Sequence, residues 1–127
     1  MILADTDVLI DYLTGVQPAN NQVRRYIQSD NLQTTAVTCF EILSGAREDK
    51  RGENAREFVD DIPVLPLDRD SAKHAAAVRQ KLEEIGFAVS MADSLIAGIA
   101  LANDLPLLTR NRKHFEHIEG LSLIPVV

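Results

Sequence analysis

Acidic side chains occur where apolar segments of this chain end, a pattern that can bind a cation. The chain begins MILADTDVLIDYL, so Asp5, Asp7 and Asp11 lie within an otherwise apolar stretch. Glu41 and Asp93 each lie near the start of a predicted helix. Two carboxylates about 4 Å apart repel each other by about 4 kcal/mol at an effective dielectric constant of about 20. If Asp5, Glu41 and Asp93 converge, either one keeps its proton or a divalent cation sits between them.

The ligand types favour Mg²⁺ or Mn²⁺ over zinc at such a cluster. A set of oxygen ligands without a Cys or His partner suits a hard cation. His74, His114 and His117 are not spaced as zinc ligands, and His74 is expected on the surface of a helix.

Short β-like runs alternate with helical runs along the whole chain. Strands are predicted at 2–4, 32–37, 62–68, 105–109 and 122–127, and helices at 7–13, within 17–30, at 39–46, after 53, at 70–85 and at 90–104. The last of these helices is apolar on nearly every side, so it should be buried. This alternation predicts a three-layer α/β/α sandwich with a mostly parallel central sheet.

Parallel sheets bind ligands outside the carboxyl ends of their strands. Asp5 directly follows the first predicted strand, and Glu41 lies a few residues after the second. Asp93 begins the buried helix, and Asn111 follows the strand that ends at Thr109. If the sheet is parallel, these four segments bring polar groups to one edge.

Helix capping is an alternative explanation for two of the acids. Thr38 and Glu41 fit the S/T-x-x-E capping box, with Thr38 as the N-cap, and Ser90 and Asp93 have the same form. An acid in the first helical turn is also favoured by the helix dipole. Both interpretations stay open, because a first-turn acid can also point outward at a cation.

Bulk properties predict one domain, residues 1–127. The net charge of −6 argues against a general nucleic-acid coat, but it leaves room for an enzyme with a local basic patch. The single cysteine, Cys39, excludes a disulfide within the chain and suits a reducing cytoplasm. We expect neither a signal peptide nor a membrane span, since no apolar run approaches about 18 residues.

Four segments together carry a family resemblance. They are ADTDVLIDYL, TAVTCFEILSGA, SMADSLIAGIALAND and LLTRNRKHFEHIEGL, in this order and spread over essentially the whole chain. In order and spacing they resemble the PIN-domain family, and more narrowly the VapC-type toxins of bacterial and archaeal toxin–antitoxin pairs.

The resemblance implies a Mg²⁺-dependent endoribonuclease, with Mn²⁺ as a substitute metal. It implies that Asp5, Glu41 and Asp93 are the catalytic residues and metal ligands, with Gly45 as the glycine of the E-x-x-x-G segment. The expected products carry 5′-phosphate and 3′-hydroxyl ends.

The chain departs from the family pattern at the fourth site position. Many PIN domains have an acid near the T-R-N segment, where this chain has Thr109 and Asn111. Asp7 lies where relatives often have Asn or Ser. We assign a secondary polar or substrate-binding role to Thr6, Asp7, Thr109, Asn111, Arg110 and Arg112. From helical spacing alone, Asp7 and Asp11 share a face that should be solvated.

Partners follow from the resemblance and from the basic residues. Two clusters could hold backbone phosphates or simply form solvated loops: Arg47, Lys50 and Arg51, and Arg110, Arg112 and Lys113. The substrate would be tRNA or ribosomal RNA, and a VapB-type antitoxin would block the site. A homodimer is also expected. Its surface could include Val8, Leu9, Tyr12 and Leu13, unless these residues form the core.

Two other functions remain open from the sequence alone. Asp5-Thr6-Asp7-Val8 fits D-x-D-x-V, which resembles the nucleophile loop of haloacid-dehalogenase-like phosphatases. Their later paired-acid motif and lysine cannot be placed in this chain. The second alternative is a PIN-like binding module without activity, in which the acids serve as helix caps.

Overall fold

The computed structural model describes residues 1–127, with five strands and seven helices. The strands are β1 (Ile2–Ala4), β2 (Leu32–Thr35), β3 (Val64–Leu65), β4 (Leu107–Thr109) and β5 (Leu123–Pro125). The helices are α1 (Thr6–Leu13), α2 (Ala19–Gln28), α3 (Ala36–Gly45), α4 (Lys50–Asp61), α5 (Arg69–Glu84), α6 (Met91–Ala102) and α7 (Arg112–Phe115).

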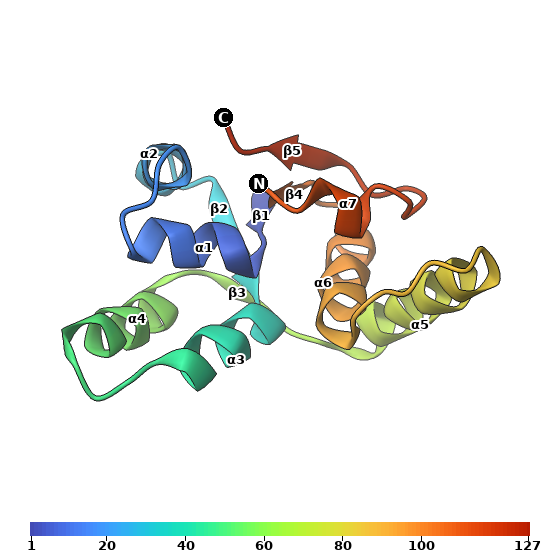
Figure 1. Cartoon of the computed structure of the whole chain (residues 1–127), viewed down its shortest axis with the longest axis horizontal. Helices are drawn as coiled ribbons and strands as arrows, with labels where there is room; N and C mark the ends of the chain where they lie inside the picture. Colours follow the sequence, from blue (N-terminus) through green and yellow to red (C-terminus); the bar gives the residue numbers. More distant parts are fainter.

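The five strands form one all-parallel sheet in the order β3-β2-β1-β4-β5. Helices α1 to α4 lie on one side of this sheet and α5 to α7 on the other (Figure 1). The predicted three-layer α/β/α architecture is therefore confirmed. In the register of the central pair, Ala4 of β1 is opposite Leu108 of β4.

Each face of the sheet has its own apolar core. Side chains alternate across a strand, so Ile2 and Ala4 join the core under α1 to α4, whereas Leu3 joins the core under α5 and α6. The predicted buried helix is α6, in which every residue from Ile96 to Ala100 is buried. It packs so closely on α5 that a Cβ added at Gly98 would lie 2.6 Å from the Cβ of Ala75.

Four predicted strands, β2 to β5, are shorter in the structure, and one helix was not predicted. β2 ends at Thr35 because the Thr35 hydroxyl caps α3 by accepting the Thr38 N–H. β3 is limited to Val64–Leu65, which lies between two prolines that cannot donate to the ladder. The short helix α7 falls within the basic run after β4.

Val8, Leu9, Tyr12 and Leu13 of α1 contribute to the core under α1 to α4, whereas Ile10 of the same helix is exposed. Val8 and Leu9 are fully buried, and Tyr12 and Leu13 pack against the same core. The core alternative is therefore correct for Val8 and Leu9, while Tyr12 and Leu13 are half-buried and keep part of their surface accessible. None of the helices combines the length and the apolar character needed to cross a membrane.

Candidate active site

Asp5 is the central acid of the site and the N-cap of α1. Its side chain is 3% exposed. Oδ1 accepts the Thr6 backbone N–H at 2.7 Å, and Oδ2 accepts the Thr109 hydroxyl at 2.8 Å. This second contact follows from the sheet register, because pairing Ala4 with Leu108 brings the next residues of β1 and β4 together.

The carboxyl group of Asp5 has a raised pKa. Burial is the largest cause and raises the pKa from 3.8 to about 6, with further increases from the charges of Asp93 and Asp7. The hydrogen bonds from Thr109 and Thr6 act in the opposite direction. A buried acid with two other carboxylates nearby is a favourable place for a cation.

Glu41 approaches the site from the middle of α3. Its Oε1 accepts the Thr6 hydroxyl at 2.7 Å, and the same hydroxyl lies 3.0 Å from the Thr38 hydroxyl. The predicted capping box is wrong here. Thr35 is the N-cap of α3, because β2 ends two residues earlier than predicted, so Glu41 lies beyond the first turn.

Asp93 lies in the first turn of α6, as predicted. The Ser90 hydroxyl caps the helix by accepting the Asp93 N–H at 3.1 Å. The Asp93 carboxylate points elsewhere, because its Oδ2 is 3.1 Å from Nδ1 of His114 on α7. The cap is therefore present, while the carboxylate itself faces the loop after β4.

The loop after β4 is bound to α1 by two acids that were predicted to be solvated. The Asn111 side-chain amide donates to Oδ2 of Asp7. Arg110 Nε lies 3.0 Å from Oδ2 of Asp11, whose side chain is only 14% exposed. The expectation of a solvated face is wrong for both acids. Helical spacing placed them on one face, but it could not indicate that a loop about a hundred residues later would cover that face.

The donor types fit a hard cation, although the side chains do not form a closed ligand shell. Asp5, Glu41 and Asp93 offer only carboxylate oxygens, as Mg²⁺ prefers. No three His, Cys, Asp or Glu side chains lie close enough together to hold a metal ion as they stand. For joint binding, Glu41 would have to turn from Thr6 and Asp93 from His114.

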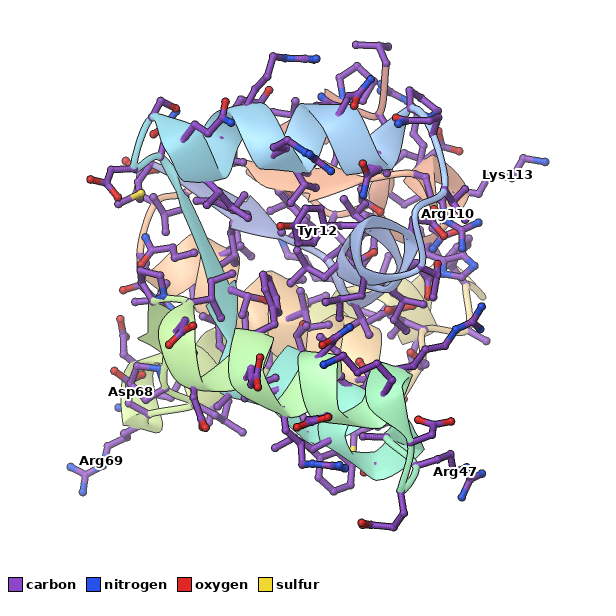
Figure 2. The ribbon with its side chains drawn as sticks, turned by 90° about the vertical axis from the view of Figure 1, so that its left-hand side faces the viewer. Tyr12, Arg47, Asp68, Arg69, Arg110 and Lys113 are labelled. Carbon is purple, nitrogen blue, oxygen red and sulfur yellow. The ribbon has the colours of Figure 1, made fainter.

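Each predicted basic cluster contains paired and unpaired cations. Arg110 lies 3.0 Å from Asp11, and Arg112 and Lys50 lie 3.8 Å from Glu116 and Glu53 respectively. Arg47, Arg51 and Lys113 make no side-chain ion pair. In Figure 2, Arg47, Arg110 and Lys113 lie toward one side of the molecule, while Asp68 and Arg69 lie at the opposite side. One member of the first cluster and two members of the second therefore lie on the same side of the fold.

Three residues with structural roles at the site were not identified from the sequence. His114 was considered as a zinc ligand and set aside, yet it contacts Asp93. Thr35 and Thr38 are buried and join β2 and α3 to Thr6 through their hydroxyls. The run TTAVT was a signal for them, because buried threonines so close together need hydrogen-bond partners.

Comparison with known families decides the family of this chain. The sequence model of the family described as PIN domain matches residues 2–121.

The chain belongs to the PIN-domain family.

Curated relatives of this PIN domain match it over nearly its whole length. It is 28% identical over 122 residues to "Ribonuclease VapC1" of Methanocaldococcus jannaschii, covering 96% of this chain and 84% of the relative. It is 29% identical over 123 residues to the "tRNA(fMet)-specific endonuclease VapC" of Shigella flexneri, covering 94% and 92%.

Solved structures agree with the fold of this PIN domain. It superimposes with a TM-score of 0.85 on a chain of the DNA-bound VapBC structure from Salmonella typhimurium, with 25% identity and 100% coverage of both chains. The resemblance found in the four sequence segments is therefore confirmed at the level of family and fold.

Proposed function

We propose that this PIN domain is the toxin of a toxin–antitoxin pair and cleaves RNA with a divalent cation held by Asp5, Asp93 and Glu41. One observation carries the proposal. Asp5 is buried beside Asp93 and Asp7, and its pKa is raised to about 6. The names of the curated relatives and the donor types of the three acids support the same activity.

The side chains around Asp5 have distinct tasks in this proposal. Thr6 and Thr109 orient the Asp5 carboxylate and favour its ionised form, in which it can bind a cation. Glu41 is half-buried and accepts the Thr6 hydroxyl, and Asp93 contacts His114. Both carboxylates would turn from these partners to hold the cation together with Asp5.

Mg²⁺ would supply the remaining chemistry, since a divalent cation stabilises charge on a phosphoryl oxygen and lowers the pKa of water. Without it, the three carboxylates would repel an anionic phosphodiester. Mn²⁺ has similar ligand preferences and is the expected substitute.

The partners of this PIN domain are also proposals. The relative from Shigella flexneri is named a tRNA(fMet)-specific endonuclease, which favours tRNA over ribosomal RNA as the first substrate to test. The Salmonella typhimurium structure is named a VapBC complex, which supports a VapB-type antitoxin here. We further propose action in the cytoplasm and a homodimer whose surface lies outside the apolar side of α1.

The test is cleavage of a mixed tRNA and ribosomal RNA pool by purified protein free of antitoxin. Mg²⁺, Mn²⁺ and EDTA are compared for the wild type, Asp5→Ala and Asp93→Ala. Asp60→Ala is the matched control, because Asp60 is an exposed acid on α4. We expect discrete cuts that require metal, disappear in both site variants and persist in the control.

Two results would contradict the proposal. Equal cleavage with Mg²⁺ and with EDTA would show that the reaction does not need a divalent cation. No cleavage by folded protein that also fails to bind Mn²⁺ would favour the alternative in which the acids are structural. A phosphoaspartyl intermediate on Asp5 would instead support the phosphatase alternative, which the family assignment now disfavours.

A further inference from the structure

A cavity of about 340 Å³ opens beside Glu41, between α1, α3 and α4. Ile10, Leu13 and Ala55 contribute an apolar wall, and Arg47 and Arg51 contribute the cationic groups. The cavity adjoins the candidate active site because Glu41, which lines it, is hydrogen-bonded to Thr6 next to Asp5.

The charges of the cavity are unevenly satisfied. Its two acids already have partners, since Glu41 accepts the Thr6 hydroxyl and Asp49 accepts the Gly52 N–H at 2.8 Å. The exposed side chains of Arg47 and Arg51 form neither an ion pair nor a hydrogen bond. The two arginines and the two acids balance in number, but only the guanidinium groups lack a hydrogen-bond or ion-pair partner, so they are free to contact an anion.

Gly52 explains why the two arginines occur together. A Cβ at Gly52 would lie 1.8 Å from the backbone oxygen of Arg47, so only glycine lets the chain before α4 fold back onto that helix. This close approach brings the Arg47 backbone beside the first turn of α4, which carries Arg51.

Gly45, in contrast, is not explained by the fold. It is the last residue of α3 and does not have a positive φ, and a Cβ there would meet nothing within 4 Å. Neither backbone conformation nor packing requires glycine at this position. Because Gly45 lines the cavity, its missing side chain leaves space that a ligand can use.

We propose that this cavity binds one nucleotide of the RNA next to the cleaved phosphate. The base packs on Ile10, Leu13 and Ala55, and the adjoining phosphate contacts Arg47 and Arg51. A nucleotide combines the two properties that the cavity complements, a flat apolar face and an anion. The proposal rests on the proposed ribonuclease function and assigns that site a substrate-binding subsite.

The first experiment measures nucleotide binding by NMR in EDTA, where no cleavage occurs. Each of the four ribonucleoside 5′-monophosphates is titrated to about 10 mM into ¹⁵N-labelled protein, a range that detects millimolar affinity. The glycine amides report the location: Gly45 and Gly52 line the cavity, while Gly86 and Gly120 are outside it. We expect saturable shifts of the first two only, and at least about fivefold weaker binding in Arg51→Gln.

Inorganic phosphate and a nucleoside without phosphate separate the two halves of the proposed ligand. Each should bind more weakly than the monophosphate, because phosphate contacts only the two arginines and the nucleoside contacts only the apolar residues. Absence of saturable shifts at Gly45 and Gly52 with every monophosphate would overturn the proposal. Equal nucleotide binding by Arg51→Gln and the wild type would also overturn the proposal. Shifts produced by an antitoxin peptide but by no nucleotide would assign the cavity to a protein partner instead.

The second experiment uses Gly45→Leu, which fills the cavity without disturbing a packed contact. Ser44→Leu is the matched control, since Ser44 precedes Gly45 on α3, is exposed and does not line the cavity. We expect Gly45→Leu to raise KM for RNA at least about tenfold, with kcat and melting temperature close to those of the control. An unchanged KM would overturn the proposal.

The two proposals can fail separately. Cleavage of RNA without nucleotide binding at the cavity would reject the subsite and keep the ribonuclease. Nucleotide binding at Gly45 and Gly52 in a protein that never cleaves RNA would keep the cavity and reject the activity.

Discussion

The two walls of the candidate active site differ in how fully their polar groups are satisfied. The inner wall consists of Asp5, Thr6, Thr109 and Asn111. Its side chains are buried or half-buried and form hydrogen bonds with one another or with α1 and α3. The outer wall consists of Gly45, Arg47 and Arg51, all exposed. Gly45 has empty space where a side chain would lie, and Arg47 and Arg51 make no ion pair.

This difference indicates where stability and ligand binding can be changed independently. Changes at the inner wall should alter the free energy of unfolding together with activity, because its groups are buried and depend on each other. Changes at the outer wall should alter binding while leaving stability nearly constant, since exposed side chains contribute little to it. The predictions below test this separation.

The largest expected effect on stability is that of Asp5→Asn at alkaline pH. The folded-state pKa of about 6 exceeds the ordinary value of 3.8, so protonated Asp5 favours the folded state. That contribution is complete below about pH 4 and is lost as the pH rises through 6. In EDTA, the variant should match the wild type at pH 4 and exceed its stability by up to about 3 kcal/mol at pH 8.

Urea unfolding at several pH values measures this difference, and added Mg²⁺ should reduce it at pH 8 by stabilising the ionised wild type. A constant difference between the two proteins across the pH range would show that burial does not perturb Asp5.

Two glycines give the next largest contrast. Gly98→Ala places a Cβ 2.6 Å from Ala75 and from the backbone oxygen of Ser71, so it should cost about 2–3 kcal/mol. Gly45→Ala meets no atom and should be neutral, or stabilise by up to about 1 kcal/mol through helix propensity. Thermal unfolding of both variants checks the prediction. Equal destabilisation would mean that Gly45 has a packing role after all.

Removing the Thr109 hydroxyl should have a moderate effect. In Thr109→Val, Oδ2 of Asp5 loses its buried donor, and the Asn111 N–H loses its acceptor. We expect a loss of about 1–2 kcal/mol at pH 8 and a further rise in the pKa of Asp5. Carboxyl NMR titration measures the pKa. Thr109→Ser keeps the hydroxyl and should restore both quantities, whereas failure of this rescue would point to packing of the methyl group.

The smallest expected effect is that of Arg110→Gln. The Arg110–Asp11 pair joins the loop after β4 to α1 at 3.0 Å, but the arginine is 48% exposed. Solvent screening limits such a pair to about 0.5 kcal/mol. Urea unfolding at low and high salt measures it, with Arg69→Gln as a control at the opposite side of the molecule (Figure 2). A loss of unfolding free energy above about 2 kcal/mol would show that Arg110 contributes to stability as strongly as the buried groups of the inner wall.

Much of the fold could be predicted because local patterns determine it. β1, α5 and the buried helix α6 lie where apolar runs and helical periodicity predicted them. The positions of Asp5, Glu41 and Asp93 after predicted strands or at helix starts were visible for the same reason. Prediction failed at Thr38, where one of several nearby threonines had to be chosen as the cap, and at Val64–Leu65, where prolines left a strand of two residues.

The sequence by itself determined which elements form and which acids follow them, because burial of alternating and helical apolar patterns is a local property. Only the tertiary structure decided which acids meet which partners. Asn111 reaches Asp7 and Thr109 reaches Asp5 across 104 residues, and both contacts follow from the register of β1 against β4. The cavity beside Glu41 likewise exists only where three helices pack, so no single segment could have revealed it.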